Sequence, residues 1–246
     1  MGKISVCIAT YNGAKYIKEQ LESILCQLSE DDEVIVSDDS STDETLQRIA
    51  ELDDSRIQIY IFDRDKSGLS LINLVTTNFE NALKKATGEI IFLADQDDVW
   101  CENKVKIMSL ILKEYDYVVS DCYLTDSNLI VKSNTRFDGS VTLSRWKALY
   151  KPTPWQGCCA AFRRSVLEKS LPFPKGIQSH DRWIGYVASF FFTYKILEDP
   201  LIFYRRHDTN ASTSTGKSRN GIVYKIRTRL KYIYELHYCP KKFSQT

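Results

Sequence analysis

The chain has 246 residues, of which 43% are hydrophobic, 12% aromatic and 26% charged, and its formal net charge is +1. This composition is typical of a folded globular protein and excludes a disordered chain, while the nearly neutral charge gives no support for nucleic-acid binding. No apolar run approaches the roughly 18 residues of a membrane-spanning helix, and the N-terminal apolar stretch is too short for a signal peptide, so the sequence predicts a cytosolic protein.

The first half of the chain alternates between strand and helix patterns. Short apolar runs predict strands at 4–9, 33–37, 57–62 and 90–94. Apolar residues at helical spacing follow the first three, and Ser41 or Thr42 is suited to cap the second helix. Strands alternating with helices predict an α/β fold with a parallel sheet.

Polar residues follow three of these strands: Thr10 to Asn12, Asp38 to Asp43, and Asp95 to Asp98. In a parallel sheet these ends meet at one edge, which is where open α/β sheets bind ligands. Asp95, Asp97 and Asp98 crowd within four positions and repel one another unless a cation or donors lie among them. Two interpretations fit: a Mg²⁺-type site that carries phosphate oxygens, or a solvated turn that caps a helix near Glu102.

Other ligand motifs are absent. No Gly-x-Gly-x-x-Gly follows the first strand, and there is no Walker sequence, so a dinucleotide fold and a P-loop enzyme are excluded. The stretch from Asp38 to Asp43 lacks the glycine of a calcium loop. Seven cysteines show no Cys-x-x-Cys spacing, and four of them lie in apolar runs, which predicts reduced, buried thiols.

The second half predicts further elements of the same sheet. Strands are expected at 117–121, 157–162 and 201–204, a hairpin or loop at 125–138, and a short helix around 143–149. Trp155 fits either a sugar-stacking residue or a surface anchor beside prolines. Asp181 opens an apolar helix, which fits a helix cap or a general base.

Six motifs, in this order, resemble the signature blocks of family 2 glycosyltransferases with the GT-A fold, in the subgroup of bacterial enzymes that build surface polysaccharides and include rhamnosyltransferases. The resemblance covers roughly residues 3–211. The motifs are Ala9–Gly13, Asp38–Thr45, Asp95–Trp100, Trp155–Phe162, His180–Trp183 and Tyr204–Asn210.

This resemblance implies a donor site. Thr10, Tyr11 and Asn12 would contact the base and ribose, and Asp39 would accept a hydrogen bond from a pyrimidine imide, which favours UDP- or dTDP-sugars because a carboxylate only accepts. Asp95 would face the ribose. The implied metal ligands for Mg²⁺ or Mn²⁺ are Asp97 and His207, although a lone histidine after a strand also fits a structural role.

The remaining implied roles concern transfer. Asp181 would be the general base of an inverting reaction, and the guanidinium of Arg205 would bind the diphosphate. The chain departs from the subgroup at Cys101-Glu102, where an apolar residue and a proline are usual. The link from Asp63 to Asn78 is also longer than usual, which bears on the sugar that fits.

The C-terminal tail is electrostatically distinct. Between Lys217 and Lys242 there are eight basic residues against Glu235 alone. From Gly221 onward a basic amphipathic pattern carries apolar residues at Ile222, Ile226, Leu230 and Ile233. Such a helix fits an anionic membrane surface or ordinary packing on the domain.

The sequence therefore predicts a GT-A domain at 1–215, with a nucleotide-binding half at about 1–120 and an acceptor-side half at about 121–215, followed by a basic helix and tail at 216–246. The expected activity is transfer of a sugar to a bacterial surface glycan, with a lipid-linked acceptor and a location in the cytoplasm or on the inner face of the membrane. A nucleotidyltransferase and an inactive sugar-nucleotide-binding scaffold remain alternatives.

Overall fold

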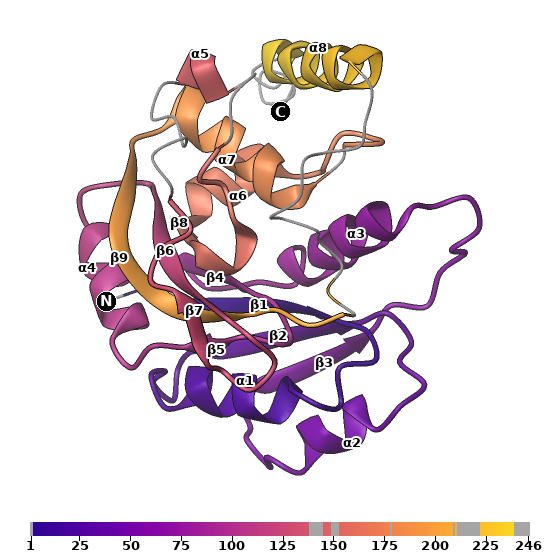
Figure 1. Ribbon diagram of the computed structural model, residues 1–246, viewed down its shortest axis with the longest axis vertical. Coiled ribbons are helices and arrows are strands. Elements are labelled where there is room, and N and C mark those ends of the chain that lie inside the picture. Colours follow the sequence, from indigo (N-terminus) through magenta and orange to yellow (C-terminus); the bar gives the residue numbers. More distant parts are fainter. Residues whose placement is uncertain are drawn as a thin grey trace.

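The computed structural model describes residues 2–137, 145–148, 153–177, 179–208, 210 and 222–238, with the backbone alone at 145, 148 and 222–226. One sheet runs through the molecule in the order β3-β2-β1-β4-β8-β6-β9-β5, and β7 pairs with β6 (Figure 1). Its strands are β1 (Ile4–Thr10), β2 (Glu33–Asp38), β3 (Ile57–Ile61), β4 (Ile90–Ala94), β5 (Val99–Trp100), β6 (Tyr117–Thr125), β7 (Val131–Ser133), β8 (Ala160–Arg163) and β9 (Tyr194–Arg205).

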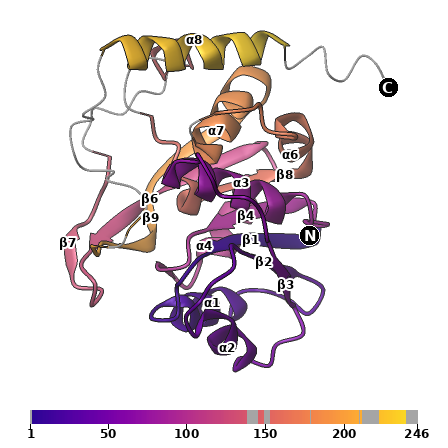
Figure 2. The same ribbon diagram turned by 90° about the vertical axis from the view of Figure 1, so that its right-hand side faces the viewer.

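Helices cover both faces of this sheet. Helices α1 (Ile17–Leu25) and α2 (Thr45–Ala50) lie on one side, and α3 (Leu71–Leu83), α6 (Arg164–Ser170) and α7 (His180–Phe191) lie on the other (Figures 1 and 2). Helix α8 (Ile222–Tyr238) crosses the outer side of α7, far from α2 (Figure 2). The others are α4 (Lys104–Ile111), α5 (Arg145–Ala148) and the 3-10 helix η1 (Gly157–Cys159).

The first four strands are parallel, as the sequence predicts. β1 pairs with β2 and with β4 in registers that align Thr10 with Asp38 and Ile8 with Ala94. Every side chain of β4 is buried, because helices cover both faces of the sheet. The C-terminal ends of β1, β2 and β4 therefore meet at one edge, which confirms the expected meeting of the three polar segments.

The second half adds antiparallel pairings. β8 joins β4 to β6, and both of its pairings are antiparallel. β9 is longer than the expected strand at 201–204, and β5 pairs with its C-terminal part so that Val99 lies opposite Phe203. Because this pairing is antiparallel, the residues just before Val99 lie beside those just after Phe203.

Three local predictions are corrected. The expected strand at 157–162 begins as the 3-10 helix η1, and only Ala160 onward is extended. The turn after Asp98 enters β5 instead of a helix, and α4 begins later with Asn103 as its N-cap residue. Of the short helix expected at 143–149, Arg145–Ala148 is helical, while Leu143 and Leu149 lie outside the described residues.

Two further predictions agree with the structure. The stretch after β6 turns into the short strand β7, as a hairpin would. Four cysteines in apolar runs are buried free thiols: Cys7, Cys122, Cys158 and Cys159.

Candidate active site

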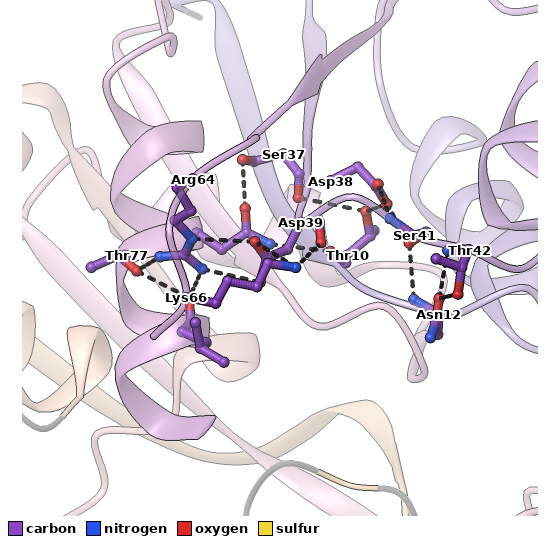
Figure 3. Close-up of polar contacts among 12 residues, drawn as sticks. Thr10, Asn12, Ser37, Asp38, Asp39, Ser41, Thr42, Arg64, Lys66 and Thr77 are labelled. Carbon is purple, nitrogen blue, oxygen red and sulfur yellow. Dashed lines mark hydrogen bonds and ion pairs between the residues drawn. The ribbon is translucent and has the colours of Figure 1, made fainter. Parts of the chain in front are cut away.

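Hydrogen bonds tie the three polar segments together at the sheet edge. The Thr10 hydroxyl donates to Asp38 Oδ2 at 2.7 Å (Figure 3). The backbone N–H of Tyr11 donates to Gln96 Oε1 at 2.9 Å, and Gln96 Nε2 donates back to the Tyr11 carbonyl at 3.1 Å. The segments after β1, β2 and β4 therefore form one surface.

Asn12 fixes the shape of the first segment. Its φ of 48° lies in the left-handed region, which asparagine tolerates better than most residues. Its side-chain Oδ1 accepts from the Thr42 N–H at 2.9 Å, and its own N–H donates to Ser41 Oγ at 2.9 Å. Ser41 and Thr42 thus bind this loop, and the expectation that either caps the next helix is wrong, because the N-cap residue of α2 is Glu44 and makes no side-chain cap.

Asp39 is buried and faces two cations that sequence reasoning missed. Arg64 Nε and Nη2 donate to its two carboxylate oxygens at 3.2 and 3.0 Å, and Lys66 Nζ lies 3.4 Å from Oδ1 (Figure 3). Both belong to the segment between β3 and α3, whose unusual length was evident from the sequence. The positive charges of this segment are the sequence signal that could have marked Arg64 and Lys66 as site residues.

Asp97 and His207 are brought together from distant parts of the chain. His207 Nε2 lies 2.8 Å from Asp97 Oδ2, and the Asn210 amide donates to the same oxygen at 3.0 Å. The His207 ring also packs on Tyr16, with 4.9 Å between ring centroids. The pairing of β5 with β9 places these residues side by side, and Asn210 is a site residue to which the sequence assigned no role.

A second cluster of acidic residues lies beside Asp97 and His207. Asp95, Asp98 and Cys158 each offer one atom that could bind a metal ion, and these three atoms lie within 4.8 Å of one another. Asp98 is fully buried; its Oδ1 accepts from the Arg205 N–H at 2.9 Å, and its Oδ2 has no hydrogen-bond partner among the described residues. Burial, and then the charges of Asp97 and Asp95, raise the pKa of Asp98 well above its usual range.

These groups fit a hard divalent cation. Carboxylate oxygens are the ordinary protein ligands of such an ion, and Asp97 Oδ2 and His207 Nε2 are close enough to bind one ion together. The buried oxygen of Asp98 without a partner is a further sign that positive charge is missing from the cluster. The residues present therefore suit Mg²⁺ or Mn²⁺.

The ionisation of Asp95 should change the free energy of unfolding. Burial, followed by the charges of Asp97 and Asp181, raises the pKa of Asp95 to about 7. Because this native pKa exceeds the unfolded value of about 3.9, the stabilisation from its protonated form is complete below pH about 4 and is lost as the pH rises through 7.

Asp95→Asn, which stays neutral, should therefore raise the free energy of unfolding at pH 8 by about 2 kcal/mol, roughly half of what the full shift implies, because Asp95 is partly exposed. At pH 4 the variant and the wild type should be about equally stable. Urea denaturation without divalent metal measures this difference. A variant less stable than the wild type at pH 8 would contradict it.

Arg205 is a buried residue whose donors face protein groups. Its Nε donates to the Asp97 carbonyl at 2.8 Å, its Nη1 to the Ser127 carbonyl at 2.7 Å, and its Nη2 to the Glu19 carboxylate. The guanidinium also lies over the Tyr16 ring. In this arrangement Arg205 holds the Asp97 loop in place, while contact with a diphosphate stays a prediction.

Asp181 lies in the first turn of α7 and is half-buried. It accepts hydrogen bonds from the Ser179 hydroxyl and from the Arg182 N–H, and the N-cap residue is Ser179 and not Asp181. A Cβ built on Gly157 would lie 3.5 Å from the Asp181 Cβ, so η1 packs directly against this turn. The charge of Asp181 raises the pKa of Asp95, so the two carboxylates lie near enough to interact electrostatically.

Two aromatic residues near Asp181 are structural. His180 is buried and stacks on Phe79 at 3.9 Å, and burial lowers the pKa of its imidazole. Trp155 is 3% exposed and makes edge contacts with Tyr117 and Tyr194. Trp155 thus belongs to the core, which supports neither sugar stacking nor surface anchoring.

Sequence comparison identifies relatives of this chain. The family model described as "Glycosyl transferase family 2" matches residues 5–171. An uncharacterised glycosyltransferase of Nostoc is 30% identical, over 88% of this chain and 68% of that protein. The dTDP-rhamnosyl transferase RfbG of Shigella flexneri is 26% identical, over 82% of this chain and 72% of RfbG.

One further relative is named in more detail. The UDP-Glc:alpha-D-GlcNAc-diphosphoundecaprenol beta-1,3-glucosyltransferase WfgD of Escherichia coli is 30% identical, over 52% of this chain. The match spans about half (49%) of the length of WfgD.

Solved structures share the fold. S. aureus TarS, residues 1–349, in complex with UDP-GlcNAc superposes with a TM-score of 0.65 and 20% identity, covering 96% of this chain and 72% of TarS. The mannosyltransferase PcManGT of Pyrobaculum calidifontis, in complex with GDP-Man and Mn²⁺, gives 0.61 and 22% identity, covering 96% and 70%.

Proposed function

The chain belongs to glycosyl transferase family 2 and has the GT-A fold, and from this premise we propose that it is an inverting, metal-dependent transferase of a sugar from a UDP- or dTDP-sugar. The observation that carries the proposal is the 2.8 Å contact between Asp97 and His207, at the sheet edge that also holds Asp39 and Asp95. Two candidate metal ligands from distant segments converge there, beside the loop that we propose contacts the base.

The donor would lie across the three joined segments. Thr10, Tyr11 and Asn12 would contact the base and ribose, with Asp39 accepting the imide N–H. Asp95 would face the ribose, and Asp97 and His207 would hold Mg²⁺ or Mn²⁺. The ion supplies positive charge that stabilises the leaving nucleoside diphosphate. The relatives RfbG, a dTDP-rhamnosyl transferase, and WfgD, a UDP-Glc-dependent glucosyltransferase, support a pyrimidine donor.

Asp181 would act as the general base. Its carboxylate takes the proton of an acceptor hydroxyl while that oxygen forms a bond to the anomeric carbon. The bond from this carbon to the diphosphate breaks, and the diphosphate leaves with the electron pair from the opposite side, which inverts the configuration. The hydrogen bonds from Ser179 and the Arg182 N–H orient the carboxylate for this step.

A thermal-shift panel of UDP-, dTDP- and GDP-sugars, with and without Mn²⁺, tests the donor and the metal together. A ligand at a hundred times its Kd adds about 2.7 kcal/mol of stability. We expect a pyrimidine nucleotide to raise Tm only when Mn²⁺ is present. If none of the sugars changes Tm under either condition, the transferase proposal fails and the binding-scaffold alternative replaces it.

The acceptor is proposed to be a growing glycan of the bacterial surface (O-antigen, capsule or exopolysaccharide) on a lipid diphosphate. The relative WfgD, a glucosyltransferase named for an alpha-D-GlcNAc-diphosphoundecaprenol substrate, supports this class. No helix in the described ranges is long and apolar enough to cross a membrane. Because a lipid-linked acceptor lies in the membrane, we propose that the protein is cytoplasmic and in peripheral contact with the inner face of the membrane.

Helix α8 is the proposed contact. Tyr232 and Leu236 pack it onto the domain, whereas Leu230 and Tyr234 are 59% and 58% exposed. The side chains of Ile222 and Ile226 lie outside the described residues, as does the tail from 239. A helix held on one side and apolar and basic on the other suits an anionic lipid surface.

Vesicle co-sedimentation should reveal this contact. The protein is expected to bind vesicles containing about a third anionic lipid more tightly than neutral ones, because each basic residue near the surface contributes about 1 kcal/mol. Leu230→Glu should weaken binding about tenfold by removing apolar area and adding repulsion. Leu110→Glu, at an equally exposed leucine on α4, is the control. Equal loss in both variants would contradict a role of α8.

A further inference from the structure

Residues of the segment after β3 contact Asp39, the hydrogen-bond acceptor of the proposed base site. Arg64 and Lys66 both reach Asp39 from this segment, and both lie on the same side of the loop that carries it (Figure 3). The two cations differ in how firmly they are held, and the difference separates their roles.

Arg64 is locked in place. Besides its two bonds to the Asp39 carboxylate, it donates from Nη2 to the Leu74 carbonyl at 2.8 Å and from Nη1 to the Thr77 hydroxyl, and it lies over the Phe62 ring. Four of its five donor hydrogens are used in these contacts. Arg64 therefore orients Asp39 and has little capacity left for a ligand.

Lys66 is held less tightly. Its Nζ donates to the Asp39 backbone carbonyl at 2.6 Å, lies 3.4 Å from Oδ1 and lies 4.8 Å from the centroid of the Tyr11 ring. About a third of its side chain (34%) is exposed, and Tyr11 is 48% exposed. The ammonium thus lies between a buried acceptor and the face of an open aromatic ring, where a flat base would stack.

Asp39 retains acceptor capacity for a ligand. A carboxylate has about four lone-pair sites, of which Arg64 uses two and Lys66 at most one. A ligand edge that enters beside Asp39 consequently meets an acceptor next to the partly exposed ammonium of Lys66.

We propose that Lys66 reads the nucleobase edge: its ammonium donates to the carbonyl oxygen adjacent to the imide N–H that Asp39 accepts. This inference rests on the proposed pyrimidine donor and adds a specificity-determining residue to it. Uracil and thymine present a carbonyl beside an N–H and satisfy both groups. Cytosine presents an amino group beside a bare ring nitrogen, so the ammonium meets a donor and the carboxylate meets a lone pair.

Asp39 and Lys66 together select for the hydrogen-bonding groups on the edge of the base and not for the size of its ring. Guanine carries the same carbonyl and N–H arrangement, so exclusion of GDP would need another feature of the site. The informative comparison is therefore UDP against CDP, which have the same ring size, ribose and diphosphate and differ only at the edge that Lys66 would contact.

Isothermal titration calorimetry of UDP and CDP in the presence of Mn²⁺ tests the proposal. The wild type should prefer UDP about a hundredfold or more, because a polar site rejects an edge that leaves its groups unpaired. Lys66→Met keeps most of the unbranched side chain but removes the ammonium, and should lower this preference about tenfold, mainly by weakening UDP. Lys85→Met is the matched control, since Lys85 Nζ lies 5.2 Å from the centroid of the Tyr60 ring.

The ratio of the two Kd values separates the outcomes. If Lys66→Met weakens UDP and CDP equally, its charge serves the diphosphate and the proposal is overturned. A wild type that binds both nucleotides equally overturns it as well. If the wild type binds neither, the proposed pyrimidine donor itself fails. An unchanged ratio in Lys85→Met with a reduced ratio in Lys66→Met supports the assignment.

Discussion

Replacing Asp181 with asparagine is expected to lower kcat for sugar transfer by about 10²–10⁴-fold, which is the usual contribution of a general base. Asparagine keeps the size of the side chain and still accepts hydrogen bonds from Ser179 and the Arg182 N–H, but its amide cannot take a proton from the acceptor hydroxyl. The loss should appear in kcat while the affinity for the donor nucleotide stays within about threefold of wild type.

Asp116→Asn is the matched control for this variant. Asp116 likewise accepts from a hydroxyl and a backbone N–H, both of Thr193, and it lies before β6 at the opposite end of the sheet from Asp95. Its substitution should leave kcat unchanged. An Asp181→Asn enzyme that retains transfer within about tenfold would assign the base to another group, of which Asp95 is the next candidate because of its raised pKa.

Sequence alone was sufficient for the parts of the fold that depend on local pattern. The run Ile90 to Ala94 predicts β4 to the residue, because an unbroken apolar stretch that short, with polar neighbours, fits only a strand covered on both faces. The meeting of three polar segments at one edge follows from parallel strand order, and so do the places of Asp39 and Asp97.

Contacts between distant segments were beyond that reasoning. Ser41 has the chemistry of a helix cap, but the nearby Asp38 carboxylate takes its hydroxyl instead. Arg64 and Lys66 lie more than twenty positions from Asp39, so their positive charges alone do not identify Asp39 as their partner. Arg205 is predicted to lie at the site, but only the structure reveals that its guanidinium faces protein carbonyls.

Asp97→Asn is expected to have opposite effects on stability and on activity. Asp97 is buried close to Asp95 and Asp98, and its charge raises the pKa of both. Removal of that charge relieves repulsion, so without metal the variant should unfold at the same Tm as the wild type or higher. The same removal deprives a bound cation of an anionic ligand, and the transfer rate should fall about a thousandfold.

The opposite changes in stability and activity make the experiment decisive. A variant that is merely misfolded would lose activity and stability together, whereas loss of a metal ligand lowers activity while the Tm without metal holds or rises. Titration with Mn²⁺ should raise the Tm of the wild type and leave that of Asp97→Asn unchanged, and His207→Ala should show an intermediate response, because it removes one neutral ligand and keeps the carboxylate. If Mn²⁺ raises the Tm of Asp97→Asn as much as that of the wild type, the ion binds elsewhere. The group formed by Asp95, Asp98 and Cys158 would then be the site to examine, since its buried carboxylate oxygen still lacks a partner within the described chain.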